Sequence, residues 1–245
     1  MSSDRADRNR ERRLERAAER ARRRPARTHG RRGLSTDVIV EAALRIADEE
    51  GVDAVSMRRL ATELRVGTMS LYHHVADKVE LLDLMADAIS AELLVPGEVL
   101  GDWREALRAI AHRTRDAFLR HPWLIDTAGM RPLVTPNSLR HVEQSIAVVA
   151  GLDVDRETAI AMVMATDDYT IGHVFRHQRI GRGGQGAASD EDRARVRELL
   201  ATGEFPNLAR VIAADADITP PPDTFEAGLE WLFDGMEAVI DARRG

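Results

Sequence analysis

Hydrogen-bonding side chains at helical spacing are concentrated in one stretch, SMRRLATELRVGTMSLYHHV at 56–75. Apolar residues in its first half recur every three or four positions, and Ser56 stands where a helix N-cap is expected. Gly67 tolerates the backbone angles of a sharp turn, and Thr68 or Ser70 can begin a second helix. Two short helices joined by about four residues form a helix-turn-helix, whose second helix can lie in the DNA major groove. The predicted chemistry is recognition of DNA.

The sequence patterns that mark common enzyme sites are missing. The eight histidines are scattered, and neither HExxH nor GxSxG occurs. The glycine-rich run GRGGQG at 181–186 lacks a Walker lysine and follows no predicted strand, so we interpret it as a loop. The chain has no cysteine, which excludes disulfides, thiolate chemistry and cysteine-based zinc sites. We therefore expect no catalysis, no metal and no cofactor, with an uncharacterised enzyme as the less favoured alternative.

Charge is distributed very unevenly along the chain, whose net charge is −6. Residues 1–33 contain 13 arginines and 5 acidic residues, whereas residues 34–80 contain 5 basic and 9 acidic residues. The first segment is too poor in apolar side chains to offset its ordering entropy, so it is predicted to be disordered. Two interpretations stay open: a solvated tail, or a basic arm that follows DNA phosphates and supplies the attraction that the acidic domain lacks.

Nothing in the sequence indicates a membrane. No apolar run approaches the roughly 18 residues of a membrane-spanning helix, and the N-terminus is too polar for a secretory signal. The expected location is the cytoplasm.

The secondary-structure elements that hold these residues in place are predicted to be helices throughout, since no alternating strand pattern occurs. After the arm at 1–33, a three-helix domain is expected at 34–80, and a helix over 77–94 links it to a larger helical domain at 95–245. Pro96 and Gly97 mark that boundary. The other expected helices cover 36–50, 102–120, 137–150, 155–177, 189–201 and 223–242.

A longer run around the helix-turn-helix, LATELRVGTMSLYHHVADKVELL, resembles the DNA-binding domain of the tetracycline-repressor (TetR) family. Leu71, Tyr72, His74, Val75 and Lys78 stand at the family's positions. Weaker similarity to the regulatory domain of the tetracycline repressor's own subfamily lies in GDWREALRAIAHRTRDAFLRHPW, AGMRP, YTIGHVF and FEAGLEWLFDGME. The resemblance implies a ligand-responsive repressor that is released from a palindromic operator by a small-molecule effector. The alternative is a helical DNA-binding protein that acts without an effector.

The resemblance also implies which residues contact DNA. Thr68, Met69 and Ser70 would reach base edges at the start of the recognition helix, while Tyr72 and His73 would lie against the DNA backbone. Two basic residues outside that helix complete the predicted set: Arg58, for a guanine or a phosphate, and Lys78, for a phosphate. For His74 we favour a structural role within the domain.

The second domain is expected to dimerise and to bind the effector. Helices at 155–177 and 223–242 would form a four-helix bundle with a second copy, because Phe225, Leu229, Leu232, Phe233, Met236 and Ile240 make a continuous apolar stripe on the last helix. The alternative is that this stripe packs within its own subunit. The candidate effector-pocket residues are Trp103, Trp123, Thr127, Met130, Met164, Asp168 and His173.

Two further residues qualify this expectation. Asp167 falls near the centre of an apolar stripe and needs a partner, either in a salt bridge with His173 or an arginine, or in a polar or cationic ligand. Thr127 stands where the tetracycline repressor has a histidine that helps to hold magnesium–tetracycline, and Glu157 alone cannot make that site. We therefore expect a different effector and no metal.

Overall fold

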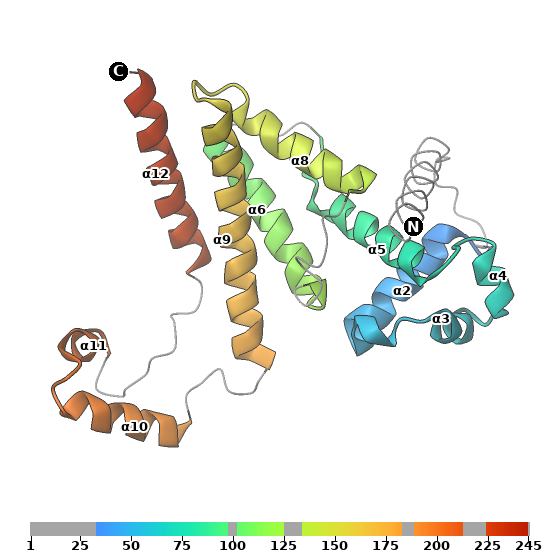
Figure 1. Ribbon diagram of the computed structural model, residues 1–245, viewed down its shortest axis with the longest axis horizontal. Coiled ribbons are helices and arrows are strands. Elements are labelled where there is room, and N and C mark those ends of the chain that lie inside the picture. The colour runs from blue at the N-terminus through green and yellow to red at the C-terminus, as the bar shows by residue number, and fades with distance from the viewer. Residues whose placement is uncertain (1–32, 98–101, 125–133, 183–188, 213–223, 245) are drawn as a thin grey trace, which may run out of the picture.

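The computed structural model describes residues 33–97, 102–124, 134–182, 189–212 and 224–244, and all of its elements are helical. The expected N-terminal arm therefore lies outside the described residues, apart from Gly33. In chain order (Figure 1), the elements are α2 (Thr36–Glu50), the 3₁₀ helix η1 (Val52–Ala54), α3 (Met57–Leu64), α4 (Thr68–Tyr72), α5 (Lys78–Leu93), α6 (Trp103–Arg120), α8 (Pro136–Val149), α9 (Arg156–Arg182), α10 (Asp190–Ala201), α11 (Pro206–Val211) and α12 (Phe225–Arg244).

The N-terminal helices begin at polar caps and enclose one apolar core. The side chains of Ser35, Ser56 and Asp77 accept hydrogen bonds from the first turns of α2, α3 and α5. Gly51, with φ +88°, ends α2 in a backbone conformation that side chains disfavour. The fully buried side chains of this core include Ile39, Ile46, Leu60, Leu71, Leu81 and Met85. The predicted helix-turn-helix is thus formed by α3 and α4, and α5 packs behind it.

The turn between α3 and α4 differs from the prediction in one respect. Arg65, not Gly67, adopts the left-handed conformation, at φ 54° and ψ 44°. Its backbone N–H donates to the carbonyls of both Ala61 and Thr62, which ends α3. Gly67 is instead an extended N-cap for α4, and a Cβ added there would meet nothing closer than 3.9 Å. The sharp turn therefore depends on Arg65.

Four helices form the centre of the second domain. Contacts join α5 to α6 and α8, α6 to α8 and α9, and α8 to α9, while α12 packs along α9 (Figure 1). A second apolar core lies where α6, α8, α9 and α12 meet, around Leu107, Phe225, Leu229 and Phe233. Helix α5 belongs to the N-terminal core and also contacts α6 and α8, so one continuous helix connects the two domains.

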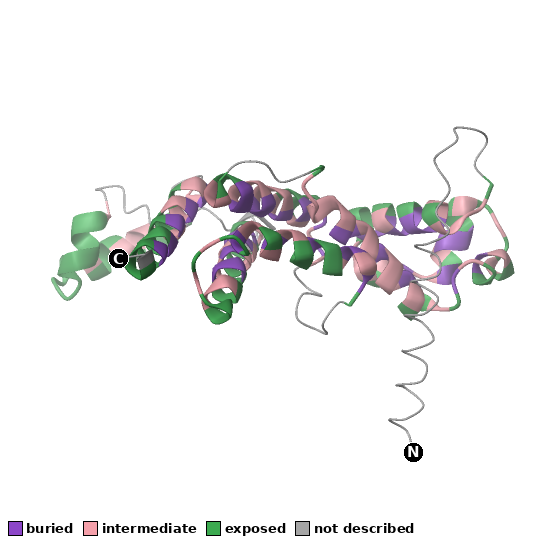
Figure 2. Ribbon diagram, turned by 90° about the horizontal axis from the view of Figure 1, so that it is seen from above, coloured by how far each residue is buried: buried purple, intermediate pink, exposed green. Residues whose placement is uncertain are grey.

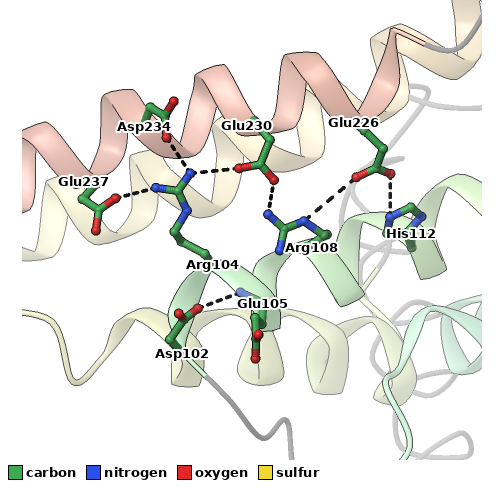
Figure 3. A network of polar contacts seen from close by, with 9 residues as sticks. All are labelled: Asp102, Arg104, Glu105, Arg108, His112, Glu226, Glu230, Asp234 and Glu237. Atoms are coloured by element: carbon green, nitrogen blue, oxygen red, sulfur yellow. Dashed lines mark hydrogen bonds and ion pairs between the residues drawn. The ribbon is translucent and has the colours of Figure 1, made fainter.

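An ionic network fastens α12 to α6 (Figure 3). Arg104 pairs with Glu230 at 3.0 Å, with Asp234 at 2.5 Å and with Glu237. Arg108, one turn later on α6, also pairs with Glu230. The hydrogen bonds from Arg104 and Arg108 lower the pKa of Glu230. The facing charges align the two helices.

The last helices differ from the prediction in length and in packing. Helix α9 continues to Arg182, so the glycine-rich run expected as a loop begins inside a helix, and residues 183–186 of that run lie outside the described residues. Helix α11 was not predicted. Neither α10 nor α11 buries any residue, as Figure 2 shows by their exposed and intermediate colouring.

Candidate functional site

The predicted DNA-contacting residues lie on the surface of three neighbouring elements. Arg58 is exposed on α3, His73 is exposed at the end of α4, and Lys78 is exposed as the first residue of α5. On α4 itself, Met69 is 71% exposed and Tyr72 is 44% exposed, whereas Thr68 and Ser70 are partly buried. All seven side chains therefore belong to one compact helical unit, in which Met69 is more exposed than Tyr72.

Buried neighbours hold this surface in place. Leu71 and Val75 are fully buried, so they anchor α4 on the core while the intervening residues face outward. Asp77 caps α5 through a 2.8 Å hydrogen bond from Glu80 N–H, which sets the position of Lys78. His74 is partly buried and has an interaction partner of its own.

Two consecutive arginines on α3 have different surroundings. Arg59 donates to Glu50 at 2.7 Å and to Glu63 at 2.8 Å, so its guanidinium links α2 to α3. Arg58 is exposed and lies about 100° around the helix from Arg59. Of the two arginines, Arg58 is therefore the one suited to contact a nucleic acid. The exposed Arg65, in the turn, was not selected from the sequence because its left-handed conformation leaves no sequence signal.

The structure does not bring the predicted effector residues together. Trp103 packs edge-on against Phe233 of α12, with ring centroids 5.8 Å apart, and Trp123 belongs to the N-terminal core. Both indoles are therefore occupied by packing, and the prediction of one pocket lined by all seven residues needs revision. The others are placed differently: Met164 and Asp168 are exposed on α9, His173 is buried beside α12, and Thr127 and Met130 lie outside the described residues.

A different set of polar side chains is buried on α5, α6, α8 and α9, the four helices that contact one another at the centre of the second domain. We call it the polar interior and define it as Ser90, Thr114, His141, Ser145, Thr166 and Thr170. Four of its six members bond a carbonyl of their own helix, one turn back. Among the described residues, Thr114 Oγ1 and His141 Nδ1 find no hydrogen-bond partner. Unpaired buried polar atoms cost free energy, so they are frequent where a ligand binds.

Two ionisable side chains of this domain, His141 and Asp167, have shifted pKa values. Burial lowers the pKa of His141, which keeps its imidazole neutral near pH 7. On α9, the pKa of Asp167 is raised to about 6, mainly by burial and secondly by electrostatic repulsion from Asp168. The salt bridge expected for Asp167 is not formed among the described residues, and His173 Nε2 lies instead 3.3 Å from Thr224 Oγ1.

The apolar stripe of the last helix is buried inside its own subunit. The second core contains five residues of the stripe: Phe225, Leu229, Phe233, Met236 and Ile240. The prediction that this stripe is buried against a second copy was therefore wrong. A different surface is available on the exposed sides of α9 and α12. We call it the outer apolar face; its large members are Ile160, Met164, Phe175, Trp231 and Val239, and Trp231 is 73% exposed.

The described residues lack the features of two other kinds of site. None of the helices there has the length and apolar character to cross a membrane. Within the same residues, no three His, Cys, Asp or Glu side chains are grouped as metal ligands. Glu157, which matches one residue of the tetracycline repressor's metal network, is exposed.

Comparison with known proteins gives consistent matches over both parts of the chain. Residues 39–85 match the family described as bacterial regulatory proteins, tetR family, and residues 95–240 match the tetracyclin repressor-like C-terminal domain. The HTH-type transcriptional repressor DrrR1 of Streptomyces coeruleorubidus is 35% identical over 86% of this chain and 80% of its own length. The class A tetracycline repressor from transposon 1721 of Escherichia coli is 28% identical over 83% of this chain and 90% of its own length.

Solved structures show the same relationship. The Streptomyces coelicolor TetR family protein ActR, in complex with actinorhodin, is 31% identical, with a TM-score of 0.70 over 86% of this chain and 98% of ActR. ActR in complex with (S)-DNPA is 33% identical, with a TM-score of 0.67 over 85% of this chain and the whole of ActR.

Proposed function

Because the chain belongs to the TetR family of transcriptional regulators, we propose that it is a repressor that grips a palindromic operator as a homodimer and is released by a small-molecule effector. The observation that carries this proposal is the path of α5. This helix begins at Lys78, beside the recognition helix, and carries Ser90 in the polar interior. One rigid element therefore connects the candidate DNA surface with the candidate effector site.

DNA recognition in this proposal rests on α4 and its neighbours. Thr68, Met69 and Ser70 meet base edges, with the methionine against an apolar group such as a thymine methyl. Tyr72, His73 and Lys78 hold the phosphates on either side, and these contacts fix orientation without selecting sequence. The domain's own charge is negative over 34–80, so binding relies on these local contacts and, in this proposal, on the basic segment at 1–33.

Dimerisation uses the outer apolar face. On α12, Trp231 lies on the same exposed side of the helix as the small residues Gly235 and Ala238. An added Cβ at Gly235 would meet nothing within 4 Å in the single chain, so a second helix can approach closely there. Aromatic side chains on such surfaces are the usual anchors of protein interfaces. A two-fold dimer places two recognition helices about one DNA turn apart, roughly 34 Å, and this makes the operator palindromic.

The effector binds at the polar interior. Thr114 and His141, on two different helices, each have a polar atom that no other described residue bonds, and the neutral imidazole favours a ligand that hydrogen-bonds without requiring a cationic partner. Of the residues first predicted, none belongs to the polar interior. Since the related ActR has been solved with actinorhodin and with (S)-DNPA, these two compounds are the first probes for this chain.

Release follows if the effector prefers the conformation that does not fit DNA. A shift of α5 relative to α6 and α8 changes the separation of the two recognition helices. The effector can drive this shift only by as much as its affinities for the two conformations differ. A tenfold loss of DNA affinity requires about 1.4 kcal/mol of such coupling.

The test begins with selection of an operator from random DNA by the purified protein. The proposal expects a palindromic consensus and binding by two chains. Actinorhodin and (S)-DNPA are then titrated against the complex of wild-type protein, and against the complex of a His141→Phe variant. The proposal predicts release of wild-type protein by at least one probe and a weaker response of the variant. Release of both proteins at equal probe concentrations would place the effector site elsewhere.

A further inference from the structure

A hydrogen-bonded cluster joins the end of α6 directly to the first helix of the DNA-binding domain. His121 Nδ1 lies 2.7 Å from Asp48 Oδ1, and Trp123 Nε1 donates to the same oxygen at 2.8 Å. His121 Nε2 faces Glu92 Oε1 on α5 at 3.4 Å, and Arg120 pairs with Glu92. We call Asp48, Glu92, His121 and Trp123 the clasp.

The two rings of the clasp are buried, whereas the side chain of Asp48, their shared acceptor, is 27% exposed. His121 is 3% exposed and Trp123 is 6% exposed. Ala117 of α6, and Trp123 just after this helix, belong to the same apolar cluster as Ile39 and Ile46 of α2. The end of a regulatory-domain helix is therefore built into the core of the DNA-binding domain.

The chemistry of the clasp makes its position well defined. One carboxylate oxygen of Asp48 accepts two ring N–H groups at normal hydrogen-bond length. Displacing the indole or the imidazole would leave buried donors without an acceptor, which is costly. The observed arrangement of the clasp, with both rings bonded to one Asp48 oxygen, is therefore favoured over arrangements that separate them.

We infer that Asp48, His121 and Trp123 are positioning residues that couple the regulatory domain to the DNA-binding domain along a path separate from the chain connection through α5. A domain held at both α5 and the clasp cannot pivot about α5 unless the clasp shifts or opens. This inference rests on the proposed function only in taking DNA binding as the output.

The position of the clasp on α6 supports this role. Thr114 of the polar interior is seven residues before His121 on the same stretch of chain, about 10 Å along a helix. A displacement of α6 caused at Thr114 therefore reaches Asp48 with no flexible segment between them. The effector and the recognition helix are linked through α6 as well as through α5.

Coupling between two sites is reciprocal, so DNA alone tests the clasp. Hydrogen exchange is followed in α6 and α9 with and without an operator fragment selected from random DNA. The variants are Asp48→Ala, which removes the shared acceptor, and Trp123→Phe, which removes one donor and keeps a ring. The matched control is Glu49→Ala, an exposed carboxylate removed from the adjacent position of α2.

In wild-type protein and in Glu49→Ala, operator binding should slow exchange in the last two turns of α6. In Trp123→Phe, which should stay folded, the slowing should shrink by at least about threefold, while the operator remains bound. Asp48→Ala should show the same loss, and circular dichroism reports whether it is folded. Equal slowing in Trp123→Phe and wild type, or no slowing in wild type, would overturn the inference. Failure of wild-type protein to select any DNA would overturn the proposed function as well.

Discussion

Replacing Gly228 by alanine should separate α12 from α9. Gly228 lies in the first turn of α12, directly beneath the ring of Tyr169 on α9. A Cβ built on it would stand 2.0 Å from the Tyr169 hydroxyl oxygen and 2.5 Å from Cζ. That hydroxyl lies 3.0 Å from the carbonyl of Thr224 and 2.9 Å from that of Phe225, and donates to them. The methyl group and the ring cannot both keep their places.

The cost can be worked out from these distances. The ring must move by roughly 1.4 Å to bring its oxygen to 3.4 Å from the new methyl group, which breaks its hydrogen bonds. The lost bond costs about 1 kcal/mol, and overpacking costs a further 1–3 kcal/mol or so. Alanine regains about 1 kcal/mol of helix propensity. The net loss is therefore about 1–3 kcal/mol, and each kcal/mol lowers Tm by roughly 2–4 °C in a chain of this size.

Differential scanning calorimetry of Gly228→Ala measures this loss. Gly151→Ala is the control, because its Cβ would meet nothing within 4 Å and its φ is not positive. It should change Tm little. A Tm of Gly228→Ala equal to that of wild type would refute the steric argument and the placement of Tyr169 over α12.

Three further outcomes are expected. Trp231→Glu should convert the proposed dimer to a monomer of 27.2 kDa in analytical ultracentrifugation, because it puts a charge at the most exposed aromatic of the outer apolar face; a variant that still dimerises would exclude that face. Asp167 has a pKa raised from 3.8 to about 6, so it favours the folded state only when protonated, and that contribution is lost as pH rises from about 4 to about 6. Asp167→Asn should therefore flatten the dependence of unfolding free energy on pH in this window and raise stability at pH 7.5 by up to about 3 kcal/mol; lower stability in urea titrations would show that a basic group of a second copy pairs with Asp167. Lys78→Gln should weaken operator binding about equally for all sequences and reduce the salt slope by about 1, whereas a changed sequence preference in the same binding assay would assign Lys78 to a base.

Local signals were enough to predict the helices of the DNA-binding domain. Ser56 caps α3 where an N-cap was predicted, and Ser35 and Asp77 begin α2 and α5 within one residue of the predicted starts, since capping depends on a few adjacent residues. The left-handed turn at Arg65 was missed because only tertiary packing holds a non-glycine residue there. Helix α11 was missed because it is short and buries nothing.

The second domain shows what periodicity cannot decide. The stripe on α12 was read correctly as apolar, yet a pattern on one helix does not say whether its own chain or another covers it. Trp103 and Trp123 were proposed for one pocket, although they lie in different cores. His141 was overlooked because its burial arises from tertiary packing, which no local sequence pattern marks.

Selection of binding sites from random DNA, followed by the stoichiometry of the best fragment, tests the central claim most directly. A folded protein should enrich one palindromic sequence with half-sites about one helical turn apart, roughly 10 base pairs, and two chains should occupy each fragment. A folded protein that enriches no sequence over bulk DNA would contradict the account.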